Sequence, residues 1–500
     1  MNNGKICISV CAKTADEVLE RVRDAETLAD VIEVRFDCME SSESEKGITA
    51  INSQKPVLFT YRPASQGGSA TDDMMPRIMF WMAAIGKSPL EQDKLWIDNE
   101  LDFGGAMQWA SETNVIRSFH DFSGVPSGLD SIYDQLSANG IAKIAVTPNS
   151  ITDSIPLWNL LDPKSDKSFI PIAMGEAGKW TRILGLAHGA FMTYASLDSE
   201  TETAPGQISA ADLIDVFRVK EIGRETQVYG VVAGDTSYSI SPWIHNAGFK
   251  AAGMNRVFVP LQVEDIDEFF RRMVKKETRE VELNFAGFSI TNPHKQSIMP
   301  WLNEIDETAV HIGAVNTVKI EGEKFFGYNT DAQGFIAPLK DRFGDLRNAR
   351  VSVFGAGGAA RACIYALVDE GAEVSLFARD KNKASALGDI FNIPVLEMPS
   401  DTHPINADIV VNTTPLGTKG DAQDKTVAVA EQLKDVKLVY DLVYNPIETR
   451  LISEAKKANT RAIGGLEMLI AQGAKQFEIW TGETAPLDTM TAAVMKKLNL

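Results

Sequence analysis

The chain has 500 residues, too many for one ordinary domain, and this length predicts about three compact units. A hydrophobic content of 44% with 23% charged residues is typical of a globular protein with substantial cores. The formal net charge of −19 argues against nucleic-acid and anionic-membrane partners, because both require a basic surface. A small anionic ligand bound by a few arginines is still compatible with this charge.

The four cysteines form neither a CxxC pair nor a zinc-binding spacing with histidine. We therefore expect no metal site, and reduced thiols at Cys7, Cys11, Cys38 and Cys363, as in a cytoplasmic enzyme. The beginning of the chain lacks the pattern of a signal or transit peptide, and no apolar run is long enough to span a bilayer. The expected location is the cytoplasm.

Eight short β-branched runs alternate with amphipathic stretches in the first part of the chain. Eight such strands predict a (β/α)8 barrel, whereas a doubly wound open sheet is the alternative. Polar residues at the strand ends favour the barrel. The predicted strands are 6–12, 30–37, 56–62, 96–103, 114–122, 141–148, 169–175 and 192–197.

The active site of such a barrel lies at the carboxyl ends of its strands, where this chain has several polar side chains. Alternation places Glu33, Arg35 and Asp37 on one face of the second strand, and an interior ion pair is the alternative explanation for them. Lys143 lies alone in the apolar run 141–146, where a lysine is costly unless it is paired or functional.

A desolvated lysine close to other cations loses its proton readily and becomes a nucleophile toward ketones. His120, on the preceding strand, can then move a proton beside the resulting imine. Lys143 and His120 together therefore indicate Schiff-base formation followed by removal of an α proton.

A second unit is expected after residue 227, with strands 228–233, 257–263 and 285–291 and helices 242–252 and 264–276. Ser239 and Ser241 precede the first of these helices, whose first turn can bind an anion; an ordinary serine cap is the alternative. Lys295 stands at an unfavourable helix start, so it is either solvated or held by an acid.

A glycine-rich run from Gly355 to Ala359 follows an apolar strand and opens a helix, as in dinucleotide-binding loops. A tight strand–helix turn is the alternative. The next strand ends in Arg379, with Lys383 four residues later, and these cations suit a 2′-phosphate. NADP is therefore favoured over NAD, although Asp380 counts against it.

In the first half, the segments EVRFD, TYRP, FHDF, IAKIAV and TAPGQI occur in the order and spacing that resemble type I 3-dehydroquinate dehydratase. The resemblance implies that Lys143 forms the imine and that His120 moves the proton. It also implies substrate-binding roles, with Arg182 as the carboxylate clamp, for Glu33, Arg35, Arg62, Arg182, Thr203 and Gln207.

Gln66 is a departure from that family, which usually has a glutamate at this position. Because glutamine cannot ionise, any support for His120 is weakened. We expect lower dehydratase activity than a Gln66→Glu variant would have.

In the second half, SxSP, NPHK, GAVNT, GYNTD, GAGGAARA, NTTPLGT and GLEMLIAQGAKQFEIW resemble shikimate dehydrogenase. The resemblance implies that Lys295 and Asp331 are catalytic. Substrate-binding roles follow for Ser239, Ser241, Thr291, Asn316, Tyr444 and Gln472. Cofactor contacts follow for Gly355, Ala356, Gly357, Gly358, Ala359, Arg379, Lys383, Thr413 and Gly465.

The two resemblances together imply an α/β protein that converts 3-dehydroquinate to 3-dehydroshikimate and then, with NADPH, to shikimate. The expected domains are a barrel at 1–224, a substrate domain at 225–335 completed by 470–500, and a Rossmann domain at 336–469. We expect a monomer or homodimer. The alternatives are a catabolic quinate/shikimate dehydrogenase fusion and a ligand sensor of weakened catalysis.

Overall fold

The computed structural model describes residues 2–106, 115–138, 140–162, 164–198, 201–398 and 404–500. The chain divides into two compact units, one of residues 1–242 and 255–285 and the other of residues 243–254 and 286–500. No helix among the described residues is long and apolar enough to cross a membrane.

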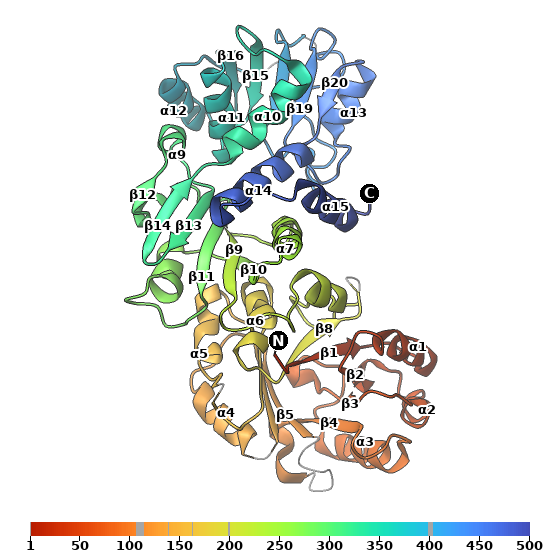
Figure 1. Cartoon of the computed structure of the whole chain (residues 1–500). Coiled ribbons are helices and arrows are strands. Elements are labelled where there is room, and N and C mark those ends of the chain that lie inside the picture. The colour runs from red at the N-terminus through yellow and green to blue at the C-terminus, as the bar shows by residue number, and fades with distance from the viewer. Residues whose placement is uncertain (1, 107–114, 139, 163, 199–200, 399–403) are drawn as a thin grey trace. The chain divides into compact units, whose positions relative to one another are not determined.

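The first unit contains a ring of eight parallel strands in the order β7-β6-β5-β4-β3-β2-β1-β8, coloured red to yellow in Figure 1. The ring is nearly closed between β7 and β8, where the Phe191 amide donates to the Phe169 carbonyl at 2.8 Å. The predicted barrel is confirmed, and residue 114, the expected start of the fifth strand, lies outside the described residues. The strands are β1 (Lys5–Val10), β2 (Val31–Arg35), β3 (Val57–Thr60), β4 (Leu95–Glu100), β5 (Val115–Asp121), β6 (Ile141–Val146), β7 (Phe169–Ala173) and β8 (Met192–Ser196).

Strand alternation divides the barrel interior into an apolar layer and a polar layer. Each strand contributes at least one residue to a buried cluster, and the first of these along each strand are Cys7, Val31, Leu58, Trp96, Ile116, Ile141, Ile170 and Met192. Two residues farther along the strands stand Ser9, Glu33, Thr60, Asp98, Ser118, Lys143, Ile172 and Tyr194. The apolar layer thus fills the interior at the amino ends of the strands, and the second layer, polar except for Ile172, faces the carboxyl ends.

Six helices accompany the barrel strands in the described part of the chain. The first is amphipathic and begins with a capping box, in which Thr14 and Glu17 each accept a backbone N–H of the other. The helices are α1 (Ala15–Ala25), α2 (Ser44–Ala50), α3 (Met74–Lys87), α4 (Leu129–Ser137), α5 (Ile155–Trp158) and α6 (Lys179–Leu184).

Cys11 and Cys38 form a disulfide, with their Cα atoms 5.6 Å apart. The prediction of four reduced thiols is therefore wrong for this pair, whereas Cys7 and Cys363 are free and buried. The two residues are 27 positions apart, but they follow adjacent parallel strands, β1 and β2, whose carboxyl ends lie side by side. A search for short cysteine spacings does not detect such a pair.

The substrate domain expected from the sequence is distributed over both units. In the first unit, β9 (Gln227–Ala233) and β10 (Arg256–Gln262) pair in parallel, and α8 (Ile266–Phe269) follows. In the second unit, β13 (Thr317–Glu321) pairs antiparallel with β11 (Phe285–Ile290) and β14 (Lys324–Tyr328), and β12 (Glu304–Ile305) pairs parallel with β14. Helices α7 (Ser241–Ala251) and α9 (Glu307–Ile312) belong to this region.

The second unit also contains a six-stranded parallel sheet in the order β17-β16-β15-β18-β19-β20. In chain order this is 3-2-1-4-5-6, a doubly wound sheet that changes direction between β15 and β18. The strands are β15 (Arg350–Phe354), β16 (Glu373–Phe377), β17 (Val395–Leu396), β18 (Ile409–Asn412), β19 (Leu438–Asp441) and β20 (Arg461–Ile463). The helices are α10 (Asp331–Phe343), α11 (Gly358–Asp369), α12 (Lys381–Phe391), α13 (Arg450–Lys457), α14 (Gly465–Thr481) and α15 (Leu487–Lys497).

Candidate active sites

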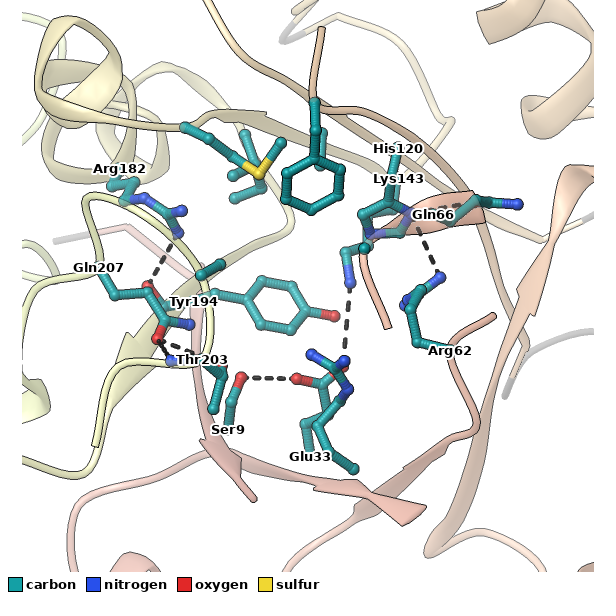
Figure 2. Close-up of a pocket in the computed structure, with 17 residues that line it drawn as sticks. Ser9, Glu33, Arg62, Gln66, His120, Lys143, Arg182, Tyr194, Thr203 and Gln207 are labelled. Atoms are coloured by element: carbon teal, nitrogen blue, oxygen red, sulfur yellow. Dashed lines mark hydrogen bonds and ion pairs between the residues drawn. The ribbon is translucent and has the colours of Figure 1, made fainter. Parts of the chain in front are cut away.

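One pocket opens at the carboxyl ends of the barrel strands (Figure 2). It brings together all eight residues that the sequence predicts for the barrel site: Glu33, Arg35, Arg62, His120, Lys143, Arg182, Thr203 and Gln207. The barrel fold explains this convergence, because parallel strands place their carboxyl ends around one mouth.

Lys143 is 5% exposed and lies between two carboxylates. Its Nζ is 3.1 Å from Asp98 Oδ2 and 4.0 Å from Glu33 Oε1, and it stands 4.1 Å from the centroid of the Tyr194 ring. Burial opposes ionisation of Asp98, but the charges of Arg62 and Lys143 hold the pKa of that carboxyl well below its usual range. The lysine that alternation singled out is therefore both buried and paired.

Arg62 organises the polar groups beside this lysine. Its Nη2 donates to Asp98 Oδ2 at 2.6 Å, and its Nη1 donates to Glu100 Oε1 at 3.0 Å and to Ser118 Oγ at 2.9 Å. The Nη1 atom also lies 3.2 Å from Nδ1 of His120. A buried guanidinium with three acceptors is fixed in place, and it lies beside the histidine.

His120 is held as a neutral base. Burial, together with the positive charges of Arg62 and Lys143, lowers the pKa of His120 well below its usual range. A neutral imidazole at physiological pH can accept a proton from a carbon acid next to an imine.

Gln66 approaches His120 from the loop after β3, with its Oε1 3.3 Å from Nδ1 of His120. The two following glycines make this approach possible. Gly67 has a φ of +76°, and a Cβ at Gly68 would stand 2.0 Å from the Arg62 carbonyl oxygen. From the sequence, Gln66 was identified only as a departure from the family pattern. The structure shows in addition that it contacts the histidine.

Arg35 and Asp37 form the interior ion pair that was the alternative for this strand. Arg35 donates to both carboxylate oxygens of Asp37, at 2.8 and 2.7 Å. Asp37 also accepts the backbone N–H groups of Arg62 and Ser69. The pair therefore holds the β3 loop at the mouth while Arg35 still lines the pocket.

Arg182 is a buried cation without a carboxylate within ion-pair distance in the described part of the chain. Its contacts are to two carbonyl oxygens, those of Tyr194 at 3.4 Å and Pro205 at 3.5 Å, and its Nε has no hydrogen-bond partner there. Burial lowers the pKa of this guanidinium to about 10, against the opposing charge of Glu202. A buried guanidinium with only long contacts to carbonyl oxygens is suited to bind the carboxylate of a substrate.

The loop after β8 supplies the remaining side of the pocket. Gln207 Oε1 accepts the Thr203 N–H at 2.7 Å and the Thr203 hydroxyl at 3.2 Å, which ties the loop together. Both side chains line the pocket beside Arg182 (Figure 2).

Tyr194 is a pocket residue that the sequence reasoning missed. It is 4% exposed, its ring projects into the pocket (Figure 2), and its hydroxyl has no hydrogen-bond partner among the described residues. Burial first, and then the negative charges of groups such as Glu33, raise the pKa of this phenol well above its usual range, so it is a donor. Its place on β8, two residues after Met192 in the alternation, was the signal that could have revealed it.

Lys295 and Asp331, the predicted catalytic pair of the second half, form an ion pair. Asn316 Nδ2 donates to Asp331 Oδ1 at 2.8 Å and to Thr330 Oγ1 at 2.9 Å, and Thr330 Oγ1 lies 3.5 Å from Gln472 Oε1. Of the two alternatives for Lys295, solvation or an acidic partner, the structure shows the second, and the acid is Asp331. This arrangement can hold and move a proton at one atom of a bound substrate.

Of the other predicted substrate residues, Thr291 and Tyr444 belong to the second unit, and Ser239 and Ser241 belong to the first. Thr291 follows β11 and its carbonyl accepts the His294 N–H at 2.8 Å, and Tyr444 lies in the loop after β19. Ser239 and Ser241 belong to the first unit, where Ser239 Oγ accepts the Ser241 N–H at 3.4 Å.

A cavity of about 660 Å³ lies where the parallel sheet changes direction, between β15 and β18. A Cβ at Gly355 would stand 2.4 Å from Thr413 Oγ1, so only glycine fits there, and its φ is +116°. The predicted cofactor residues that line it are Gly355, Ala356, Gly357, Arg379, Lys383 and Thr413. The structure does not place Gly358, Ala359 or Gly465 on its lining; the first two open α11, and Gly465 packs against the Leu442 carbonyl.

Asp380 lines the same cavity, and its carboxylate also has a structural role at the start of α12. Its carboxylate accepts the Lys383 N–H at 3.1 Å and caps α12, and Lys383 Nζ lies 3.8 Å from it. Arg379 lies beside the cap without a salt bridge in the described residues. The cavity therefore fits a dinucleotide with a 2′-phosphate, which Arg379 and Lys383 would hold.

Comparisons with known proteins match both halves of the chain. Residues 6–224 match the model of type I 3-dehydroquinase, residues 231–318 that of the shikimate dehydrogenase substrate-binding domain, and residues 465–495 that of the shikimate 5′-dehydrogenase C-terminal domain. A crystal structure of a shikimate dehydrogenase in complex with NADP⁺ has a TM-score of 0.50 and 35% identity, and covers 55% of this chain and 97% of that one.

Curated relatives agree with this division. A shikimate dehydrogenase (NADP⁺) of Methanocaldococcus jannaschii is 37% identical over 56% of this chain and 99% of its own length. The chloroplastic bifunctional 3-dehydroquinate dehydratase/shikimate dehydrogenase of Arabidopsis thaliana is 33% identical over 97% of this chain and 83% of its own. With the barrel pocket, the Lys295–Asp331 pair and the dinucleotide cavity in one polypeptide, the chain belongs to the family of bifunctional 3-dehydroquinate dehydratase/shikimate dehydrogenases.

Proposed function

We propose that the chain carries out two consecutive reactions: dehydration of 3-dehydroquinate at the barrel, and NADPH-dependent reduction of the product, 3-dehydroshikimate, at the second site. The observation that carries the proposal is the convergence of Lys143, His120 and Arg182 on one pocket. A buried amine, a neutral base and a free guanidinium are the groups that imine-mediated loss of water from a keto acid requires.

In the barrel, Arg182 binds the substrate carboxylate and so orients the ring. The amine of Lys143 adds to the ketone, and loss of water gives the iminium. His120 removes a proton from the adjacent carbon and then delivers it to the departing hydroxyl, which leaves as water. Hydrolysis of the imine releases 3-dehydroshikimate and restores Lys143.

In the dehydrogenase half, Asn316 holds Asp331, Asp331 pairs with Lys295, and Lys295 gives a proton to the reacting oxygen as the ketone becomes an alcohol. The family resemblance assigns Thr291, Asn316 and Gln472 to ring hydroxyls, Tyr444 to the pocket lining, and Ser239 and Ser241 to the carboxylate. The NADPH that this family uses supplies the hydride when it is bound.

Borohydride trapping with 3-dehydroquinate tests the first reaction, with the modified residue located by mass spectrometry. An adduct at Lys143 is expected, and a trapped protein without modification at Lys143 would contradict the mechanism. For the second reaction, NADPH oxidation is followed with 3-dehydroshikimate. Lys295→Met is expected to abolish this activity while the same polypeptide keeps its dehydratase activity.

We further propose the domain limits 1–224, 225–335 with 470–500, and 336–469, with a cytoplasmic monomer or homodimer that has no nucleic-acid or membrane partner. The acidic net charge of −19 supports the last point. Light scattering on the purified chain tests the assembly state, and fractionation of cells tests the location.

A further inference from the structure

The polar contacts of His120 determine which of its two ring nitrogens carries the proton. Both Arg62 Nη1 and Gln66 Oε1 approach the same atom, Nδ1, at 3.2 and 3.3 Å. An arginine can only donate, whereas the Gln66 carbonyl oxygen can only accept. The two contacts therefore demand opposite protonation states of Nδ1, and one of them must prevail.

The hydrogens of Arg62 Nη1 already have better acceptors. This atom carries two hydrogens, and it lies 3.0 Å from Glu100 Oε1 and 2.9 Å from Ser118 Oγ. The Ser118 hydroxyl itself donates to Asp98, so its oxygen is free to accept from Arg62. With both Nη1 hydrogens engaged, Nδ1 of His120 has no need to accept from Arg62 and can donate to Gln66.

The orientation of the Gln66 amide is set from its other side. Its Nε2 lies 3.1 Å from Oδ1 of Asp102, a carboxylate that can only accept, so the amide NH₂ must point there and the carbonyl oxygen must point to His120. Asp102 is in turn fixed by the buried Arg77, which contacts its two oxygens at 2.7 and 3.3 Å.

We infer that Asp102 is a positioning residue of the dehydratase: it orients the Gln66 amide so that His120 keeps its proton on Nδ1 and presents an unprotonated Nε2 as the base. The inference rests on the proposed dehydratase function. It also gives Gln66 a role, because a neutral amide held by a carboxylate accepts the same hydrogen bond that a glutamate would accept.

The variant Asp102→Asn reverses this chain of hydrogen bonds. The oxygen of the introduced asparagine is drawn to the strong contact with Arg77, which places its NH₂ opposite Gln66. Gln66 must then present its oxygen to that NH₂ and its own NH₂ to His120. Nδ1 becomes an acceptor, the proton moves to Nε2, and the base is lost.

The double variant Asp102→Asn with Gln66→Glu restores the direction of the chain. The NH₂ of the introduced asparagine donates to the introduced glutamate, and the other oxygen of that carboxylate accepts from Nδ1–H of His120. Gln66→Glu alone places two carboxylates at the 3.1 Å contact, so the gain expected from a glutamate here requires the change at Asp102.

The test compares the wild type, D102N, Q66E and the double variant in the dehydratase assay. A fall of about 10² in kcat is expected for D102N, the usual contribution of a general base, together with a larger isotope effect at the abstracted hydrogen. Borohydride trapping at Lys143 and the dehydrogenase activity of the same chain should remain. The double variant should recover at least the wild-type rate.

Asp72→Asn is the matched control, because Asp72 is exposed and accepts the Ser65 N–H on the same loop without touching Gln66. It should behave as wild type. A D102N rate equal to that of wild type, or a double variant as slow as D102N, overturns the inference. If the wild type neither dehydrates 3-dehydroquinate nor is trapped at Lys143, the proposed function fails, and the inference fails with it.

Discussion

Lys143 and Asp98 form a buried ion pair at the mouth of the barrel, with Nζ 3.1 Å from Oδ2. The same oxygen of Asp98 receives Arg62 at 2.6 Å, so one carboxylate fixes both the amine and the guanidinium. The attacking amine and the cation beside His120 are therefore positioned by a single acid on β4.

Asp98→Asn is expected to lower the rate of imine formation as well as overall turnover. Without the charge, Arg62 relaxes toward Glu100 and the Lys143 amine is no longer held, and misplacement of a reacting group by about 1 Å can cost about 10² in rate. Rapid quenching with borohydride measures imine formation directly. Asp121→Asn, at the end of β5 where the aspartate contacts Ser123 and Thr147, is the control; equal rates in the two variants would contradict this role.

Arg182 predicts a trade-off between binding and stability. As a buried cation without an ion-pair partner among the described residues it opposes folding, so Arg182→Leu should raise the melting temperature of the barrel, by about 2–4 °C for each 1 kcal/mol gained. The same variant should raise KM for 3-dehydroquinate by about 10² or more, since a charged bidentate partner of the carboxylate is lost. Calorimetry and steady-state kinetics check both effects, and a destabilised variant would argue against an unpaired cation.

The lowered pKa of His120 predicts dehydratase activity that persists in mild acid. The base must be neutral, and burial with the charges of Arg62 and Lys143 keeps it neutral below pH 6.5. The acid limb of kcat/KM should therefore lie below the range of a free histidine. Because the pKa of His120 is lower in the folded state, the unfolded chain binds a proton that folded His120 does not. The free energy of unfolding should therefore decrease as the pH falls below the unfolded value of 6.5. An acid limb at or above pH 6.5 would contradict this environment.

The hydroxyl of Tyr194 has no hydrogen-bond acceptor in the described part of the protein. We therefore predict that an oxygen of the substrate accepts its hydrogen bond. A buried hydroxyl without a partner costs about 1–3 kcal/mol, which a substrate oxygen can recover on binding. Tyr194→Phe keeps the ring over Lys143 and removes only the donor, so the dehydratase kcat/KM should fall about tenfold while stability stays the same or increases. An unchanged kcat/KM would show that the hydroxyl makes no contact with the substrate.

The elements that position the sites could be predicted from short-range patterns. Lys143 stood out because a period of two makes one charged residue in an apolar strand conspicuous. The glycines before α11 were readable in the same way, since a turn from strand to helix at a nucleotide site imposes local backbone requirements that glycine meets. Both signals lie within a few residues of the group that they identify.

The remaining features depend on pairings between strands and loops that are far apart in the chain. Gln66 and Asp102 are 36 residues apart, and the sequence gives no sign that the second orients the first. The disulfide between Cys11 and Cys38 arises only because β1 and β2 end side by side. Asp380 looked like an obstacle to NADP until its role as the cap of α12 was visible.

Arg379 predicts the cofactor preference of the dehydrogenase. It lines the dinucleotide cavity beside the end of β16, and with Lys383 it is one of the two cations on the described lining that could hold a 2′-phosphate. Arg379→Ala should raise KM for NADPH by about 10–100-fold, as expected for loss of one charge-assisted contact, and leave KM for NADH nearly unchanged. Asp380→Ala is the matched control: it should lower stability by about 1 kcal/mol through loss of the helix cap, without changing the ratio of the two constants. If instead Asp380→Ala changes the preference for NADPH over NADH and Arg379→Ala does not, then Asp380 rather than Arg379 determines the cofactor preference.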